Sequence, residues 1–486
     1  MTVSVGLSDV LMISPLIALF LFSLIPLTSK VLSKNTEQSP ASSLIVALIG
    51  LCVSAGLLIV FSGSEQTAFN GQLLFDGLTK WMGLVSLFGA AGGLVMMYEN
   101  PATRGKQFSE LIFLALNSIV GMLILIAAVN LITIFIGLEL MSLSLYLMIA
   151  MSHEQKISKE AALKYFVLGS FASAIFLYGT SFIFGSSNTV NIVELMTNAA
   201  VLVKTSKLFL FGISFVILGF CFKVSIVPFH AWTPDVYQGA ATPVSSFMAT
   251  AVKAASFAAL LRVMATQTLN GSQNLFDVLQ WLAVLTMTIG NVAALLQNNF
   301  KRMLAYSSIS HSGYILVGVI ASGISQNSAF SAASVIFYLL AYSVMTMGAF
   351  AIVSLLEKSE NNFVNIDDLA GFAKNQPALA LCLSVFLFSL AGIPPAIGFF
   401  GKFYLFSAAV NEGLMWLALW GVINSVISVY YYLRPIVTMY MKKGDADIAA
   451  HPQQATMVLV VMSALFVIIA GIFSGPIFNL IESLLA

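Results

Sequence analysis

The stretch LGFCFKVSIVPFHAWTPDVYQGAATPVSSF (residues 218–247) decides how this chain folds. It begins as an apolar membrane segment but contains Lys223, and three prolines follow: Pro228, Pro234 and Pro243. Proline removes a backbone donor and clashes with the carbonyl one turn back, so a helix must break here. A broken helix persists within a membrane only where protein or a water-filled cavity satisfies the freed backbone groups. The stretch therefore predicts a bundle of membrane helices with a protected polar interior.

A second stretch, SLAGIPPAIGFFGKFY (residues 389–404), repeats this pattern in the other half of the chain. Pro394 and Pro395 are adjacent, and Lys402 follows them. One broken helix in each half points to an inverted repeat with a transport site between the halves. We therefore expect helices four to eight to be mirrored by helices nine to thirteen, with helices seven and twelve broken.

The composition places most of this chain in lipid. Of its 486 residues, 59% are apolar and only 8% are charged, and the mean hydropathy is +0.97. Soluble domains are about one-quarter charged, so a soluble multidomain enzyme is excluded. The net charge of +1 gives no general attraction to nucleic acid. The three cysteines and four histidines are scattered, which argues against a disulfide framework and against a haem or metal centre.

About fourteen apolar stretches, each near the 20 residues that cross a bilayer, occupy nearly all of the sequence. We expect an all-α polytopic fold with one integral membrane domain over residues 1–486. Its expected parts are helices one to three (1–105), the first inverted repeat (106–267), the second (275–441) and helix fourteen (454–486). The first stretch, Val10 to Thr28, lacks the flanks of a cleaved signal peptide and is expected to be retained.

The basic residues predict the orientation, because cytoplasmic loops carry an excess of lysine and arginine. Twelve of them lie in odd-numbered loops: Lys30, Lys34, Arg104, Lys106, Lys156, Lys159, Lys301, Arg302, Lys358, Lys374, Lys442 and Lys443. Four lie in even-numbered loops: Lys80, Lys204, Lys207 and Arg262. We therefore expect the odd loops to be cytoplasmic and both termini to lie on the outer side.

Ionisable residues inside the apolar segments are the strongest sign of function. Glu139 lies in LITIFIGLELMSLSLYLMIA (131–150), Lys253 lies in PVSSFMATAVKAASFAALL (243–261), and Lys223 and Lys402 lie beside the two breaks. A charge at the bilayer centre costs at least about 2.5–3.5 kcal/mol, so such residues are kept for a reason. Each also has a structural explanation. Glu139 would be hydrogen-bonded to a neighbouring helix, Lys223 would snorkel to the interface, and Lys402 would anchor a helix there. A structural role stays open for Lys253 too, although it lies about ten residues from either end of its segment, where snorkelling is harder.

Three further residues are weaker candidates for the same function. Lys164 lies about one turn inside its helix, His230 follows the first break, and His311 lies in YSSISHSGYILV (306–317) among small polar residues. For each of them a structural role fits the sequence as well or nearly as well. Asp235 and Arg262 are expected at helix ends, in structural roles.

The chemistry that these groups permit is proton transfer. Desolvation disfavours the ammonium form of a buried lysine, and a nearby carboxylate restores it. A row of lysines would thus pass charge along the midplane of the membrane, each step altering the next. Metal-cation sites are built mainly from carboxylates, whereas cationic side chains dominate here, which favours protons over sodium.

Four segments resemble the antiporter-like membrane subunits of respiratory complex I over roughly residues 70–440. They are FKVSIVPFHAWTPDVYQGAATPVSSFMATAVKAASF (222–257), GLELMSLSLY (137–146), NNFKRMLAYSSISHSGYILVG (298–318) and LAGIPPAIGFFGKFY (390–404). The resemblance implies two inverted five-helix bundles and a location in the bacterial cytoplasmic (inner) membrane. It also implies that the chain associates with the other membrane-arm subunits, including sister antiporter-like subunits.

The resemblance further implies a proton path through Glu139 on the fifth helix, Lys223 at the first break, Lys253 on the eighth helix and Lys402 after the second break. Lys164 matches a further lysine on the sixth helix. Quinone reduction elsewhere in the complex would perturb Glu139 and so bias Lys223. The chain itself is expected to hold no cofactor and to oxidise no NADH alone, with FMN, iron–sulfur clusters and quinone in partner subunits.

Three different functions stay open on the sequence. The chain could serve a multisubunit Na⁺/H⁺ antiporter, in which the same lysines exchange protons against sodium. It could belong to a membrane-bound hydrogenase. It could also be a scaffold of the membrane arm, because structural polar networks place glutamate and lysine in helices as well.

Overall fold

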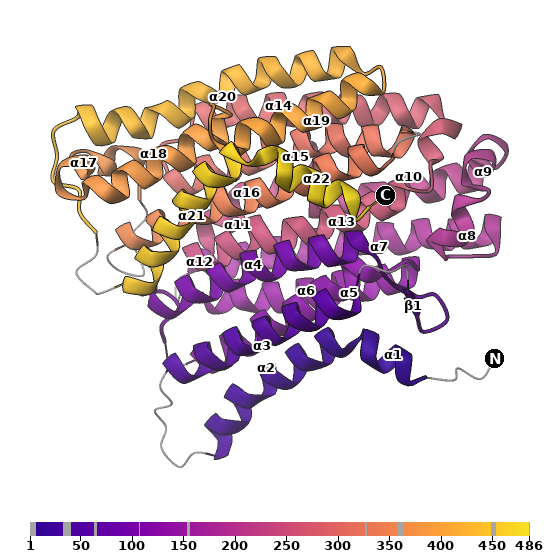
Figure 1. The fold of residues 1–486 in the computed structure, drawn as a ribbon, viewed down its shortest axis with the longest axis horizontal. Coiled ribbons are helices and arrows are strands. Elements are labelled where there is room, and N and C mark those ends of the chain that lie inside the picture. The colour runs from indigo at the N-terminus through magenta and orange to yellow at the C-terminus, as the bar shows by residue number, and fades with distance from the viewer. Residues whose placement is uncertain are drawn as a thin grey trace.

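The computed structural model describes residues 6–32, 40–62, 66–105, 107–152, 156–325, 328–357, 364–448 and 453–485. These residues form a bundle of long helices that lie mostly side by side (Figure 1). The helices α2 and α3 lie at one edge of the bundle in this view, and α20 lies at the opposite edge. The predicted all-α polytopic membrane fold is confirmed, with a two-stranded hairpin as its only sheet among these residues.

The N-terminal third contains the hairpin and the helices around it. Its elements are α1 (Leu7–Met12), α2 (Ser14–Leu32), α3 (Pro40–Phe61), β1 (Gln66–Ala68), β2 (Leu73–Phe75), α4 (Gly77–Glu99), α5 (Phe108–Ala127), α6 (Leu131–Met151) and α7 (Lys156–Ser187). The antiparallel strands pair Gln66 with Phe75. Asp76 then caps α4, because its carboxylate accepts a hydrogen bond from the backbone N–H of Thr79.

The middle of the chain is made of shorter pieces. They are α8 (Ile192–Met196), α9 (Ala199–Thr205), α10 (Lys207–Lys223), α11 (Trp232–Gly239), α12 (Thr242–Phe247), the π-helical turn η1 (Met248–Val252), α13 (Lys253–Met264) and η2 (Thr268–Gly271). The three segments α12, η1 and α13 form one continuous span in which every residue is buried. This central span is the core around which the other helices pack.

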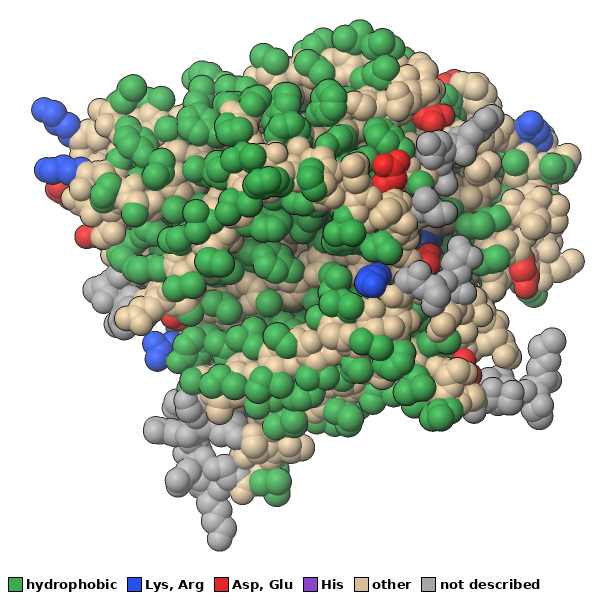
Figure 2. Space-filling view, viewed as in Figure 1, with side chains coloured by type: hydrophobic (Ala, Val, Ile, Leu, Met, Phe, Trp, Pro, Cys, Tyr) green, Lys and Arg blue, Asp and Glu red, His purple; other side chains and the backbone are tan. Residues whose placement is uncertain are grey.

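The remaining helices complete the bundle. They are α14 (Gln273–Leu295), α15 (Phe300–Ile324), α16 (Ser328–Leu356), η3 (Ile366–Leu369), α17 (Phe372–Asn375), α18 (Pro377–Ala391), α19 (Ile397–Asn411), α20 (Met415–Met441), α21 (Gln454–Ile472) and α22 (Ser474–Ser483). Peripheral helices expose large apolar side chains, such as Val426 and Tyr430 of α20. Hydrophobic side chains cover most of the face in Figure 2, and the charged ones in view lie mainly toward its two ends, as expected for a protein surrounded by lipid.

Twelve helices are long and apolar enough to cross a membrane, and the bent pair α9–α10, with an angle of 117°, makes up to thirteen among the described residues. The further stretch expected near residue 390 is split into α18 and α19, each of 15 residues. Neither half is long enough to cross alone. The total of fourteen, the inverted repeats and the four parts of the domain therefore stay predictions. The orientation also stays a prediction, and Lys34, Lys106 and Lys358 lie outside the described residues.

The first predicted break is confirmed. The helix α10 ends at Lys223, and α11 begins only at Trp232. Neighbouring groups satisfy the interrupted backbone, as a break within a membrane requires. The Trp232 indole N–H donates to the Phe222 carbonyl at 3.1 Å, and the Val227 N–H donates to the Thr286 hydroxyl at 3.0 Å.

The second predicted break is confirmed as well. The helix α18 ends at Ala391, where Gly392 adopts a left-handed conformation with φ of +87°. Glycine takes up this conformation without the steric cost that other residues meet. The helix α19 begins at Ile397, and the Gly398 N–H donates to the Ser389 hydroxyl at 3.1 Å.

A buried ion pair ties the central span to α4. Arg262 donates to both carboxylate oxygens of Asp76, at 2.9 and 2.7 Å, and to the Thr79 hydroxyl and the Ile126 carbonyl. Burial favours a raised pKa for the Asp76 carboxyl, but the Arg262 guanidinium and the hydrogen bonds from Thr79 together outweigh burial and hold that pKa below its ordinary value. The ion pair therefore stabilises the fold at neutral pH, and this stabilisation is lost as the pH falls through the lowered pKa of Asp76. Arg262 thus has the structural role that its place at a helix end predicted.

We expect the substitution Asp76→Ala to destabilise the fold by about 3–5 kcal/mol, because it leaves the buried Arg262 without a counter-charge. The matched control is Asp367→Ala, since Asp367 forms an exposed pair with Lys442 at 2.7 Å. An exposed pair contributes at most about 1 kcal/mol. Thermal aggregation of the chain in solubilised membranes, followed by immunoblot, would measure both variants. Equal losses of stability in the two variants would contradict the structural role assigned to the Asp76–Arg262 pair.

Candidate functional site

Three of the predicted relay lysines are buried inside the bundle. Lys223, Lys253 and Lys402 are only 5%, 3% and 4% exposed. Lys223 is the last residue of α10, Lys253 is the first residue of α13, and Lys402 lies within α19. Burial of this degree does not fit a snorkelling Lys223 or an interfacial Lys402. Their roles in proton transfer stay a prediction.

Lys223 is held by a hydroxyl group and three aromatic rings, one of which is that of the preceding Phe222 at 5.8 Å. Its ammonium donates to the Ser142 hydroxyl of α6 at 2.6 Å, and that hydroxyl donates to the Leu138 carbonyl at 2.5 Å. The rings of Tyr165 and Tyr146 lie 5.6 and 6.0 Å from the nitrogen, within the range of a cation–π interaction. The position at the C-terminal end of α10 also suits a cation, because the helix dipole is negative there.

Glu139 lies one turn before Ser142 on α6, near Lys223, and Ser173 of α7 donates a hydrogen bond to its carboxylate. The side chain is only partly buried, whereas the sequence predicted a buried carboxylate. The reason is that this side of α6 lies at the surface of the chain, where the neighbouring Ile136 and Leu143 are exposed. The carboxylate therefore sits at the outer edge of the site and not inside it.

Lys253 contacts α15 at the centre of the bundle. Its ammonium donates to the Ser308 carbonyl at 2.7 Å and also to the Ser308 hydroxyl. The Tyr342 ring of α16 lies 5.3 Å from the nitrogen. The π-helical turn η1 directly precedes Lys253, and such turns occur frequently at functional sites.

Lys402 is bound by the end of the broken helix. Its ammonium donates to the carbonyls of Leu390 and Ala391 at 3.0 and 2.9 Å, and to the Ser425 hydroxyl at 2.8 Å. These carbonyls end α18 and have no partner within their own helix, so the lysine satisfies them. A largely apolar cavity of about 550 Å³ opens beside Lys402 and is lined by Phe399, Phe403 and other residues of α19 and α20.

His311 lies on α15 between Lys253 and Lys402, close enough for electrostatic interaction with both. Its Nδ1 shares a hydrogen bond with the Tyr338 hydroxyl at 2.6 Å, and its Nε2 shares one with the Tyr432 hydroxyl at 2.9 Å. The Tyr432 hydroxyl also bonds Ser307, one turn before His311. The structure thus brings His311 together with two of the lysines, and its role in proton transfer stays a prediction.

The structure does not bring His230 or Lys164 into this group. His230 is half-buried in the first break, and its Nδ1 has no hydrogen-bond partner among the described residues. The Lys164 side chain is 43% exposed and pairs with Glu160 at 2.8 Å and Asp235 at 3.0 Å. Asp235 also pairs with Arg302. Lys164 therefore belongs to a surface network of ion pairs, in which Asp235 has the structural role expected of it.

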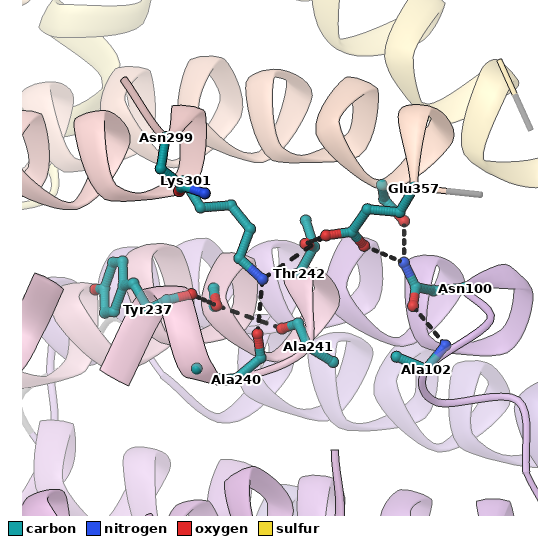
Figure 3. A network of polar contacts seen from close by, with 12 residues as sticks. Asn100, Ala102, Tyr237, Ala240, Ala241, Thr242, Asn299, Lys301 and Glu357 are labelled. Carbon is teal, nitrogen blue, oxygen red and sulfur yellow. Dashed lines mark hydrogen bonds and ion pairs between the residues drawn. The ribbon is translucent and has the colours of Figure 1, made fainter. Parts of the chain in front are cut away.

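Sequence reasoning missed a second buried cluster (Figure 3). Lys301 donates to the Ala240 carbonyl at 2.7 Å and lies 3.7 Å from the Glu357 carboxylate. That carboxylate accepts hydrogen bonds from Thr242 at 2.5 Å and from Asn100 at 2.9 Å. The sequence placed Lys301 in a loop. The signal that it lies inside a helix is the preceding Asn299, which caps α15.

Lys253, His311 and Lys402 lie together, and with Lys223, which lies apart beside α6 and α7, they supply amines and an imidazole, groups that bind and release protons. No group of three or more histidine, cysteine, aspartate or glutamate side chains in the described part of the chain could hold a metal ion.

The chain matches the family model described as NADH:quinone oxidoreductase/Mrp antiporter, transmembrane, over residues 128–428. It is 67% identical to NADH-quinone oxidoreductase subunit N of Bdellovibrio bacteriovorus over 482 residues, which cover 99% of each chain. It is 42% identical to the subunit N of Trichlorobacter lovleyi, with 89% of this chain and 88% of the relative covered.

Solved structures share this fold. A chain of respiratory complex I from Thermus thermophilus with bound aureothin is 31% identical, with a TM-score of 0.81 and coverage of 96% of this chain and 98% of that one. A chain of the Mrp complex from Dietzia sp. shares the fold alone, at 19% identity with a TM-score of 0.80 and coverage of 99% and 97%. This protein therefore belongs to the subunit N family of NADH-quinone oxidoreductase, the antiporter-like membrane subunits of respiratory complex I.

Proposed function

We propose that this chain couples the transfer of electrons from NADH to quinone, carried out elsewhere in the complex, to proton translocation across the membrane. The proposed relay consists of Glu139, Lys223, Lys253 and Lys402. One observation carries the proposal: the three lysines are buried, and no carboxylate of the described residues lies within 4 Å of any of them. A buried, unpaired charge is costly, so its presence is best explained by a functional need to change protonation state.

Glu139 is the first member of the proposed relay. Its carboxylate attracts the Lys223 ammonium, so any change in the charge or position of Glu139 changes how strongly Lys223 holds a proton. Because the side chain is partly exposed in a membrane span, a neighbouring subunit of the membrane arm would cover it. That subunit would transmit the perturbation that starts in the quinone-reducing part of the complex.

Charge then moves from Lys223 to Lys253 and through His311 to Lys402. Each protonation disfavours a positive charge on the next group, since like charges in a medium of low dielectric repel strongly. His311 can accept a proton at one ring nitrogen and release one at the other, and both nitrogens have a tyrosine hydroxyl within hydrogen-bonding distance. We place Lys164 and His230 outside the main path.

The proposal leaves redox chemistry to the partner subunits. FMN, iron–sulfur clusters and quinone would bind there, and this chain would provide only the proton-conducting part of the enzyme. Its partners would be other membrane-arm subunits, including sister antiporter-like subunits. We further propose a bacterial cytoplasmic membrane with both termini on the outer side, as the distribution of lysine and arginine predicts.

Sodium–proton exchange is the second candidate, favoured by the shared fold with the Mrp complex chain. It is weaker, because the buried groups of the site are lysines, which do not coordinate sodium. A role in a membrane hydrogenase and a scaffold role without transport are weaker still, since no contact in the site favours either. Substitutions at Lys223 and Lys402 separate a pump from a scaffold.

We expect Lys223→Ala to lower both NADH oxidation and NADH-driven acidification of inverted membrane vesicles steeply, while the content of assembled complex stays normal. A proton-transfer group typically contributes about a hundredfold or more to rate, which sets the scale of the loss if the relay is obligatory. Lys442→Ala, which removes an exposed lysine, is the control and should keep both rates. Wild-type rates in Lys223→Ala would remove the main support for the relay.

Lys402→Arg distinguishes proton transfer from scaffolding. Arginine keeps the positive charge and the donors that bind Leu390, Ala391 and Ser425, but it cannot release a proton in a protein. The cavity beside Lys402 has room for the larger head group. A relay predicts that acidification is lost in assembled complexes, whereas a scaffold predicts that it is retained. The measurement is vesicle acidification per milligram of complex. Repeating it with and without sodium would also test whether the chain exchanges protons against sodium.

A further inference from the structure

The pair formed by Lys301 and Glu357 has no role in the relay described above. Both side chains are buried, at 1% and 6% exposure, and their charged atoms are 3.7 Å apart, farther than in a direct hydrogen bond. Desolvating two such ions costs several kcal/mol each, so a buried pair is weak evidence for a purely stabilising role. The pair therefore calls for a functional explanation.

Its ligands come from segments that are far apart in the sequence (Figure 3). Asn100 ends α4, Ala240 and Thr242 join α11 to α12, Lys301 lies in the first turn of α15, and Glu357 directly follows α16. The pair thus lies at one end of the seam where α12, α15 and α16 meet. The same α15 carries Ser308, the hydroxyl that binds Lys253, seven residues beyond Lys301.

A row of buried hydroxyl groups leads from the pair toward Lys253. Thr242, which donates to Glu357, is followed one turn later by Ser246 on the central span. Four buried hydroxyls form no hydrogen bond of ordinary length and angle within the described residues: Ser246, Tyr342, Ser343 and Thr346. The last three lie on α16, which packs against α12 and η1. Buried polar groups of this kind are normally satisfied by ordered water.

The row approaches the lysine, because the centre of the Tyr342 ring lies 5.3 Å from the Lys253 nitrogen. It also passes along η1, the π-helical turn between Ser246 and Lys253. A π-helical turn departs from the regular hydrogen-bond ladder and is common at functional sites. The seam between the central span and α16 therefore offers a polar route from the pair to Lys253.

An acidic cavity lies next to the pair, on the side away from Lys253. It has a volume of about 480 Å³, and Leu356, the residue before Glu357, lines it together with Asp367, Asp368, Asp445 and Asp447. Clustered carboxylates raise the local concentration of cations, protons included. This cavity lies on the face that the basic residues predict to be cytoplasmic.

We propose that Lys301 and Glu357 form a proton-loading site that supplies Lys253 from the face with the acidic cavity. This inference rests on the proposed function. A proton leaves hydronium in the cavity and binds a carboxylate oxygen of Glu357. It then passes through the Thr242 and Ser246 hydroxyls, with bridging water, to the neutral amine of Lys253. One proton enters and one is delivered, and the Lys301 ammonium stabilises the carboxylate that is left behind.

The test compares Glu357→Gln with Lys253→Met in the assembled complex, in inverted vesicles driven by NADH. Glu357→Gln keeps the shape of the side chain but cannot carry a proton. We expect it to lower acidification and to raise the ratio of the rates in H₂O and D₂O, because proton loading becomes limiting. A merely structural defect lowers the acidification rates in H₂O and in D₂O by the same factor, so their ratio stays unchanged. Glu357→Asp should restore much of the rate, and Asp277→Asn, an exposed carboxylate, is the control.

The two proposals fail in different ways. If Lys253→Met pumps at the wild-type rate, the proposed relay is wrong. If Lys253→Met is inactive while Glu357→Gln keeps both the rate and the isotope ratio, only the loading site is wrong. Should Glu357→Gln assemble poorly, the double variant Lys301→Gln/Glu357→Gln replaces the pair by neutral groups and leaves no unpaired charge. A wild-type rate and isotope ratio in this variant would likewise overturn the loading site.

Discussion

The cost of holding a charge away from water governs this structure. Hydrocarbon offers no solvent to an ammonium group, so each buried lysine needs partners supplied by the protein. The second helix break supplies such partners, because Lys402 takes the free carbonyls at the end of α18, whereas Lys223 at the end of α10 takes the Ser142 hydroxyl of α6. The second break and its lysine are thus one arrangement, since the free carbonyls and the ammonium satisfy each other.

Two kinds of buried charge follow from this constraint. Arg262 is fully paired with Asp76 through two hydrogen bonds, and this geometry suits a permanent link between the central span and α4. Lys253 and Lys402 instead contact only neutral groups among their described partners. Neutral ligands hold a lysine in either protonation state, whereas a carboxylate would fix it as a cation. The type of partner therefore distinguishes Arg262, which has a structural role, from Lys253 and Lys402, which we propose to transfer protons.

The sequence predicted the features that depend on local chemistry. Prolines in apolar segments indicated both breaks, and isolated ions indicated Lys223, Lys253 and Lys402. It could not predict features that depend on packing between distant helices. The partial exposure of Glu139 depends on which side of α6 faces outward, and the pairing of Lys301 with Glu357 joins the start of one helix to the end of another. A residue near a helix end looks like a loop residue until its neighbours are known.

The complete burial of the central span has a consequence for biogenesis. The span packs against α4 and α5, which are made before it, and against α15 and α16, which are made after it. Its lysine therefore meets its Ser308 ligand only after the ribosome has synthesised α15. Until then the nascent chain must keep Lys253 in a temporary environment, such as the insertion channel or the interface. Insertion and packing must accordingly be separate stages for this protein.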